Sequence, residues 1–256
     1  MLNLILTGTI DPSIFSNTGV VLTNAEERLK QYKSAIHFYI TNSPFENIIF
    51  IENSGYPFNF KEISNYANKY NKKIEYIKVE TDKESTLKFG KSYGEADLIT
   101  KAILQSNLLK GEISFYKVTG RIKIINIKKM ILSNNDSAFL FRHDLKRCYT
   151  FFFKANINQY KKYFINSQYL CDEKRGYDIE RVYYDIIMKN DLNVTNYKFY
   201  PLLKGTIGTN GLQYGDNCFV YYIKNILTIL GLYNKHGNRI ILKCLAFSRL
   251  LMFKKV

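Results

Sequence analysis

The chain has 256 residues, and its 37 lysines and arginines against 22 aspartates and glutamates give a net charge of +15. Hydrophobic residues make up 46% and charged residues 23%, which is ordinary for a globular protein and excludes global disorder. No apolar run approaches the roughly 20 residues that cross a bilayer. The short apolar N-terminus lacks a basic leader, so we interpret it as a first strand and expect a cytoplasmic protein.

The first third of the sequence alternates strand and helix patterns. Short β-branched or apolar runs predict strands at 2–6, 47–51 and 74–79, and apolar residues at helical spacing predict helices at 25–40, with Asn24 as its cap, and at 60–71. A strand–helix–strand order at this spacing is typical of a parallel sheet with right-handed crossovers.

The pattern continues with weaker signals. We expect a helix at 96–109, a strand at 112–118 continued by an apolar stretch at 122–131, short strands at 139–142 and 149–153, and a helix at 179–188. The last part, 218–253, predicts two helices broken at 231–238. The sequence therefore predicts one mostly parallel α/β domain over residues 1–216 and a helical segment over 217–256.

The C-terminal segment carries charge of one sign. After Asp216 there is no acidic residue, and seven basic residues are interspersed with apolar ones: Lys224, Lys235, Arg239, Lys243, Arg249, Lys254 and Lys255. This pattern suits an anionic membrane surface or a polyanion. Two other interpretations stay open: lysine as surface filler from an AT-rich coding sequence, and a C-terminal helix docked on the sheet with a solvated basic stripe.

The cysteines and histidines give no sign of a metal site. The four cysteines, Cys148, Cys171, Cys218 and Cys244, stand singly, and the three histidines are scattered. This excludes a cysteine-based zinc knuckle and gives no sign of a disulfide framework, and we expect no structural metal.

Four polar segments are placed where a parallel sheet binds ligands, beyond the carboxyl ends of its strands. Three follow strands: Thr7-Gly8-Thr9, Glu52-Asn53-Ser54-Gly55 and Thr119-Gly120-Arg121. The fourth, at 90–95, opens a helix and contains Lys91, Gly94 and Glu95. Backbone N–H groups at a helix start, with Lys91, predict a phosphate cradle there. The P-loop and the dinucleotide fingerprint are both absent, so the segments together indicate a nucleotide-type ligand without naming it.

These motifs, taken in order, resemble those of bacterial surface-polysaccharide glycosyltransferases of lipopolysaccharide and capsule clusters. The resemblance covers about residues 2–215. It rests on Leu-Thr-Gly-Thr-Ile near the start, Arg28 with Gln31-Tyr32, Ile-Glu-Asn-Ser-Gly after the second strand, Gly-Lys-Ser-Tyr-Gly-Glu before a helix, and Tyr-Lys-Val-Thr-Gly-Arg. It implies a GT-A-like mixed, mostly parallel sheet and a nucleotide-sugar donor.

The sequence departs from that family where a divalent metal is usually held. The family's Asp-X-Asp is replaced by Lys117-Val118-Thr119-Gly120-Arg121, which has no carboxylate. We expect Lys91, Lys117 and Arg121 to neutralise the leaving phosphate directly, with no divalent metal or other cofactor. The alternative is that Lys117 and Arg121 flank the strand as solvated charges.

Sugar transfer with inversion needs a base for the acceptor hydroxyl. Glu180, at a predicted helix start, is one candidate, and Asp144 with His143 is the other. Asp178 and Glu180 are equally compatible with ordinary helix N-terminal charges. Tyr214, in the glycine-rich loop at 205–215, is the one aromatic candidate for acceptor contact.

The donor-binding residues predicted from these patterns are Thr7, Gly8, Thr9, Glu52, Asn53, Lys91, Gly94, Glu95, Lys117, Thr119, Gly120 and Arg121. For three of them other roles stay open: Glu95 as a ribose contact or a helix cap, and Glu52 and Asn53 as base contacts or turn residues.

The resulting hypothesis is a glycosyltransferase on the inner face of the cytoplasmic membrane that adds sugar to a lipopolysaccharide or capsule glycan. The alternatives are an inactive scaffold of the same fold and a basic nucleic-acid-binding protein. Nucleic acid is not expected, because no helix-turn-helix, zinc or RNP-type signature is present.

Overall fold

The centre of the protein is a five-stranded sheet. The computed structural model describes residues 1–15, 23–142, 146–206, 213–214 and 218–235. The strand order is β3-β2-β1-β4-β8, in which the first four strands are parallel and β8 is antiparallel to β4. The strands are β1 Asn3–Gly8, β2 Asn47–Glu52, β3 Lys73–Lys78, β4 Ser114–Thr119 and β8 Phe152–Asn156. The predicted α/β class with a mostly parallel sheet is confirmed.

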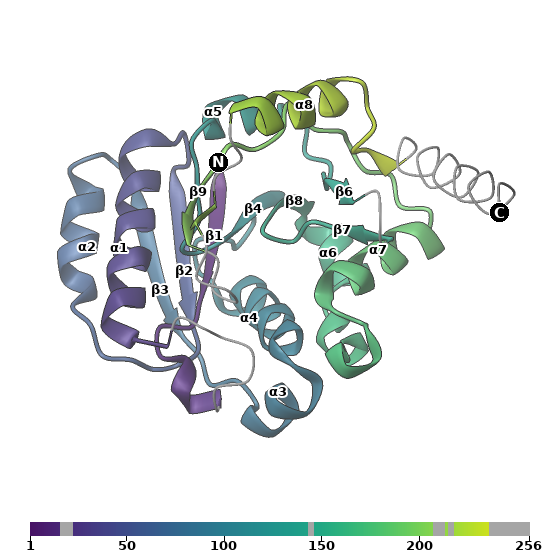
Figure 1. The fold of residues 1–256 in the computed structure, drawn as a ribbon. Helices are drawn as coiled ribbons and strands as arrows, with labels where there is room; N and C mark the ends of the chain where they lie inside the picture. The colour runs from purple at the N-terminus through teal and green to yellow at the C-terminus, as the bar shows by residue number, and fades with distance from the viewer. Residues whose placement is uncertain (16–22, 143–145, 207–212, 215–217, 236–256) are drawn as a thin grey trace, which may run out of the picture.

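Helices cover both faces of this sheet (Figure 1). Along β1, Leu4 and Leu6 pack in a core with α1 and α2, while Ile5 packs in a second core with α4, α6 and α7. The alternation follows from the pleat, which sends successive side chains to opposite faces. The helices are α1 Ala25–Asn42, α2 Phe60–Asn68, α4 Lys91–Gln105, α6 Ile157–Tyr163 and α7 Ile179–Lys189.

The helix starts explain where sequence reasoning succeeded and where it was wrong. The side chain of Asn24 accepts from the Glu27 N–H, so the predicted cap of α1 is confirmed. The predicted start of the helix after Gly90 was wrong by five residues, because α4 begins at Lys91. Gly90, with φ of 99°, separates α4 from α3 (Lys83–Phe89), a helix that lacks an apolar periodicity and was not predicted. Residues 91–95 are therefore a helical turn rather than a loop.

Smaller elements lie outside the central sheet. A three-stranded sheet has the order β10-β9-β5, and β6 and β7 form a hairpin. A short helix, α5, follows β5 within the stretch predicted as one apolar run. The bounds of these elements are β5 Lys123–Ile124, α5 Ile127–Met130, β6 Phe141–Arg142, β7 Arg147–Cys148, β9 Leu203–Thr206 and β10 Gln213–Tyr214.

The C-terminal segment begins with α8 (Cys218–Ile229), which confirms the first of the two helices predicted there. The second predicted helix and most of the basic residues lie beyond residue 235, outside the described residues. The division at residue 216 stays a prediction. Within the described ranges, no helix is both long and apolar enough to cross a bilayer.

Candidate functional site

A cavity of about 700 Å³ opens at the carboxyl ends of β1, β2 and β4. From the strand ends, its lining includes six of the predicted residues: Thr7, Gly8, Thr9, Asn53, Thr119 and Arg121. From the helices it includes Lys91, Gly94 and Glu95 on α4 and Glu180 on α7. Because parallel strands deliver their carboxyl ends to one edge, these distant segments meet, as the sequence predicted. The volume is in the range of small-ligand sites.

Arg28, Tyr32 and Arg121 form one side of this cavity, which we call the guanidinium wall. Arg28 and Tyr32 lie one turn apart on α1, and the Arg121 guanidinium lies 5.8 Å from the centre of the Tyr32 ring. Arg28 Nε donates to the carbonyls of Thr9 (2.9 Å) and Ile10 (3.1 Å), and the Tyr32 hydroxyl accepts from the Thr9 N–H (2.9 Å). The loop after β1 is thereby fixed to α1.

Arg121 keeps unused hydrogen-bonding capacity. Its side chain is only 8% exposed, and Nη1 donates to Gln31 Oε1 (3.0 Å) and the Thr206 carbonyl (3.4 Å). Its buried Nε has no hydrogen-bond partner within the described part of the chain. Burial lowers the pKa of Arg28, and the neighbouring positive charge of Arg121 lowers it further, against an opposing effect of Tyr32. Two adjacent buried guanidiniums, one with an unused donor, are suited to an anion.

Two glycines allow the wall to pack this closely. A Cβ on Gly120 would lie 2.7 Å from the Thr7 carbonyl oxygen and 3.1 Å from the Tyr32 ring, and one on Gly8 would lie 2.7 Å from Phe50. Gly120 does not line the cavity, so its predicted donor contact is wrong. Its role is to let the end of β4 approach β1 and Tyr32.

The segment after β2 divides into one cavity residue and one structural residue. Asn53 lines the cavity, where its Oδ1 accepts from Thr9 Oγ1 (2.7 Å) and its Nδ2 donates to Thr81 Oγ1 (3.0 Å). Glu52 is fully buried, and its carboxylate accepts from the backbone N–H groups of Ile10 and Gly55. The expectation that Glu52 contacts the donor is therefore wrong, because its oxygens tie the loops after β1 and β2 together.

Lys117 is not at a strand end facing a phosphate, and the prediction that placed it there is wrong. Its side chain is fully buried, and its ammonium ion-pairs with Glu95. It also donates to Thr119 Oγ1 (3.2 Å) and to the carbonyl of Thr150 (2.7 Å). Glu95, which lines the cavity, does not cap its own helix but is held by Lys117.

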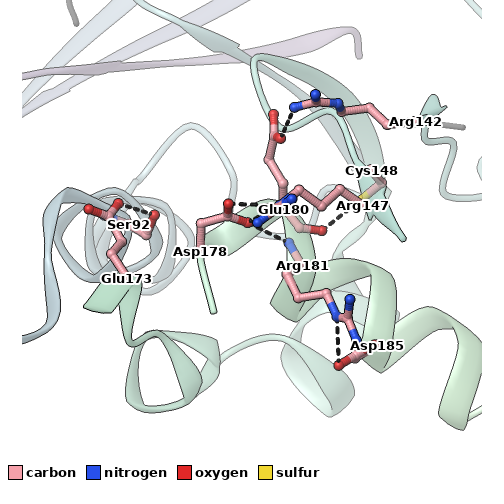
Figure 2. A network of polar contacts seen from close by, with 9 residues as sticks. All are labelled: Ser92, Arg142, Arg147, Cys148, Glu173, Asp178, Glu180, Arg181 and Asp185. Atoms are coloured by element: carbon pink, nitrogen blue, oxygen red, sulfur yellow. Dashed lines mark hydrogen bonds and ion pairs between the residues drawn. The ribbon is translucent and has the colours of Figure 1, made fainter. Parts of the chain in front are cut away.

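The start of α4, where the sequence predicted a phosphate cradle, already holds a carboxylate. Glu173 Oε1 accepts from the Ser92 N–H (3.0 Å) and from its hydroxyl (2.5 Å), as Figure 2 shows. A Cβ on Gly90 would lie 2.4 Å from Glu173 Oε2. Lys91 is exposed beside this contact and lines the cavity. The backbone amide at the helix start is thus used by the protein itself.

Two ion pairs form the opposite side of the cavity, which we call the carboxylate wall. Asp178 and Glu180 begin α7, and Arg142 and Arg147 come from the β6–β7 hairpin. Arg142 Nη1 lies 3.2 Å from Glu180 Oε2, and Arg147 Nε lies 2.8 Å from Asp178 Oδ2 (Figure 2). Asp178 also accepts from the Arg181 N–H (2.8 Å), so it caps the helix, which is the ordinary role left open for it.

Glu180 combines a perturbed pKa with an accessible oxygen. Burial raises its pKa, Arg142 opposes this, and the negative charges of Asp178 and Glu95 raise it further. Oε2 accepts from Arg142, while Oε1 has no hydrogen bond to any residue that the structure describes. A carboxylate with a raised pKa beside a cavity is typical of a general base or acid.

The remaining candidates lie outside what the structure describes. His143 and Asp144 fall in 143–145, and most of the glycine-rich loop falls in 207–212 and 215–217. Tyr214 ends β10, and its side chain is among those not described.

The residues that line the cavity and were not in the predicted site include Arg28, Tyr32, Arg142, Arg147 and Glu173. Arg28 had a detectable signal, because it is a charged residue on the apolar face of a predicted helix, four positions before Tyr32. The other three charged residues gave none, since their partners are distant in sequence.

The donor set for a metal is poor. The end of β4 offers Thr119, Gly120 and Arg121 and no carboxylate, and no group of three or more histidine, cysteine, aspartate or glutamate side chains that could hold a metal occurs among the described residues. The residues at this position therefore do not fit the metal that Asp-X-Asp enzymes hold.

No protein-family model matches the chain, and no curated protein sequence matches it. Among solved structures, a galactosyltransferase, LgtC, in complex with donor and acceptor sugar analogues, superposes over 77% of this chain and 74% of its own with 7% identity and a TM-score of 0.49. The bifunctional glycosyltransferase WbbM gives 9% identity over 77% of this chain and 39% of its own, with a TM-score of 0.43. Core-mannan synthase A from Aspergillus fumigatus, in an Mn/GDP form, gives 12% identity over 73% and 69%, with a TM-score of 0.39. At these values the likenesses concern chain path and assign no function.

Proposed function

We propose that this protein is a glycosyltransferase that moves a sugar from a nucleotide-sugar donor to a lipopolysaccharide or capsule glycan. The observation that carries the proposal is the pairing of two features in one cavity: an anion-suited guanidinium wall and, opposite it, a half-buried carboxylate with a raised pKa. Displacement of a nucleoside diphosphate by a hydroxyl needs both.

The two walls divide the work of an inverting transfer. Arg121, with its unused Nε–H, binds the diphosphate and stabilises the charge it gains as the bond between the sugar and the phosphate breaks. Glu180 takes the proton of the acceptor hydroxyl as the new bond to the sugar forms. In this proposal Thr9 and Asn53, just after β1 and β2, and Tyr32 on α1 bind the nucleoside; all three line the cavity.

A binding screen tests the proposal. Purified protein is titrated with uridine, cytidine, adenosine, guanosine and thymidine nucleotides and their sugar conjugates, with thermal unfolding as the readout. A ligand that binds the native state raises the Tm by mass action. We expect one nucleobase to stand out and its sugar conjugate to be consumed on adding a glycan acceptor. No shift with any of these, and no consumption, would contradict the proposal.

We also propose that the enzyme works at the cytoplasmic face of an anionic membrane, where a lipid-linked acceptor is found. Support comes from α8, which leaves Phe219, Tyr222, Ile226 and Ile229 more than half exposed just before most of the basic residues of this segment. Apolar residues beside basic ones bind anionic interfaces, at about 1 kcal/mol per lysine or arginine.

Truncation tests the membrane proposal. A chain ending at Gly237 should stay folded, bind phosphatidylglycerol vesicles much more weakly than the full chain and keep its activity on a soluble acceptor. Unfolding of the truncated chain would show that the segment is core, and undiminished vesicle binding would show that the basic tail is not the anchor.

A further inference from the structure

Lys117 presents an energetic problem that the proposed function does not yet explain. It lies in the middle of β4, with no exposed surface, on the face where Phe115 packs in the core with α4. Its ammonium makes three contacts, with Glu95, Thr119 and Thr150. Replacing a buried ion pair by apolar residues of similar size is often neutral or stabilising. Stability alone therefore does not account for this pair.

The pair fixes a carboxylate in the cavity. Only one oxygen of Glu95, Oε1, accepts from Lys117 and from Thr119 Oγ1 (3.3 Å). Its Oε2 has no hydrogen bond to any described residue, and the side chain is 28% exposed and lines the cavity. The buried ammonium thus holds Glu95 at one oxygen and leaves the other facing the ligand space.

Glu95 lies between the two walls. On one side it contacts Thr119, two residues before Arg121 at the end of β4. On the other side its charge is near enough to raise the pKa of Glu180. In a transfer from a phosphate held by Arg121 to a hydroxyl activated by Glu180, the group between these two ends is the sugar itself.

We propose that Glu95 is a catalytic residue that faces the transferred sugar and that Lys117 is its positioning residue. The inference rests on the proposed function. As the bond to the leaving phosphate breaks, the ring oxygen and anomeric carbon of the sugar gain positive charge. The negative charge of Glu95 stabilises this charge without forming a bond or taking a proton: the electron pair leaves with the phosphate, and the acceptor's proton goes to Glu180.

The test separates this role from a structural one by comparing single and double variants. Glu95→Gln leaves a buried ammonium without its counter-ion, so we expect its Tm to fall by about 10 °C and its kcat to fall about 100-fold. In Glu95→Gln/Lys117→Met both charges are gone, and we expect the Tm to return to near the wild-type value while kcat stays low. In all variants the affinity for the nucleoside diphosphate that the wild type binds should change less than threefold.

Lys154→Met is the matched control. Lys154 is also a buried lysine, in the neighbouring strand β8, but it donates to the backbone carbonyls of Leu132 and Asn134 and does not line the cavity. The Lys154→Met variant should have a lower Tm than the wild type and an unchanged kcat.

A double variant with wild-type kcat would overturn the inference and leave the proposed function intact. If the double variant does not fold, Lys117→Met alone decides, since Glu95 is then charged but unheld: lower kcat at unchanged nucleotide affinity supports the inference, and unchanged kcat overturns it. A wild-type protein that binds and consumes no nucleotide sugar would instead overturn the proposed function, and the inference with it.

Discussion

The two walls of the cavity are both rich in arginine, yet their arginines are bonded to different partners. On the guanidinium wall, Arg28 donates to backbone carbonyls. Arg121 donates to an amide and a carbonyl, and its Nε–H has no partner among the described residues. On the carboxylate wall, Arg142 and Arg147 pair with carboxylates.

The difference decides what each wall can bind. Carbonyls and amides are neutral, so the charge of Arg121 remains available to an anion entering the cavity. A carboxylate neutralises its arginine, so the second wall attracts an anion less, and what it offers a ligand is an oxygen that accepts a proton. The comparison predicts that variants in the two walls fail in different ways: loss of catalysis with binding kept at the carboxylate wall, and loss of both at the guanidinium wall.

The largest effect is expected at Glu180. Glu180→Gln keeps the size of the side chain and removes its ability to take a proton, so kcat should fall by about 10²- to 10⁴-fold while nucleotide affinity changes little. Steady-state kinetics with a parallel binding titration measures both. Wild-type kcat would remove Glu180 from the mechanism and leave the base to be found elsewhere, with Asp144 or His143 as the next candidates.

Arg121→Ala should give a smaller loss of kcat, about 100-fold, together with weaker binding of the nucleoside diphosphate. The matched control is Arg181→Ala, because Arg181 pairs with Asp185 on α7 and does not line the cavity. If nucleotide affinity in a folded Arg121→Ala variant equals that of wild type, the distinction between the walls is wrong.

The pH dependence of the carboxylate wall follows from the raised pKa of Glu180. The base works only when ionised, so kcat should fall as the pH drops through this pKa, at a higher pH than for an ordinary glutamate. Arg142 lowers the pKa of Glu180, so Arg142→Gln should raise this pKa further and move this limb of the pH–rate profile to higher pH. An unchanged profile would show that Glu180 is not the group that titrates.

How much of this site the sequence predicts depends on the range of the interactions. Helical and alternating patterns, with Asn24 as a cap, predict the βαβ order, and that order alone brings Thr9, Asn53 and Arg121 to one edge. Even the inward direction of Lys117 had a signal, because alternation along β4 places it on the same face as Phe115. The prediction for Lys117 was wrong because it treated a lysine within the strand as a charge at the end of the strand.

The carboxylate wall was not predictable in the same way. Its ion pairs join the β6–β7 hairpin to α7, which lies 31 to 38 residues further along the chain. No local pattern specifies such a pairing. The contact of Glu173 with Ser92, across 81 residues, was unpredictable for the same reason. The start of a helix favours an anion, but no local pattern shows that a carboxylate of the same chain, Glu173, fills this place.

The smallest expected effect is that of metal removal, and it tests whether the guanidinium wall does the work of a metal. Arg121 stands at the end of β4, where the resemblance would place the carboxylates of a metal site. If its charge neutralises the diphosphate, kcat in EDTA should equal kcat in buffer, and added Mg²⁺ or Mn²⁺ should change it less than twofold. Arg121→Ala sharpens the test, because added Mn²⁺ should not rescue a cavity whose described residues offer no metal ligand set. Loss of wild-type activity in EDTA, restored by Mn²⁺, would contradict this assignment: the diphosphate charge would then be met by a metal. Arg28 would serve to hold the loop after β1, and Arg121 to join α1 to β9.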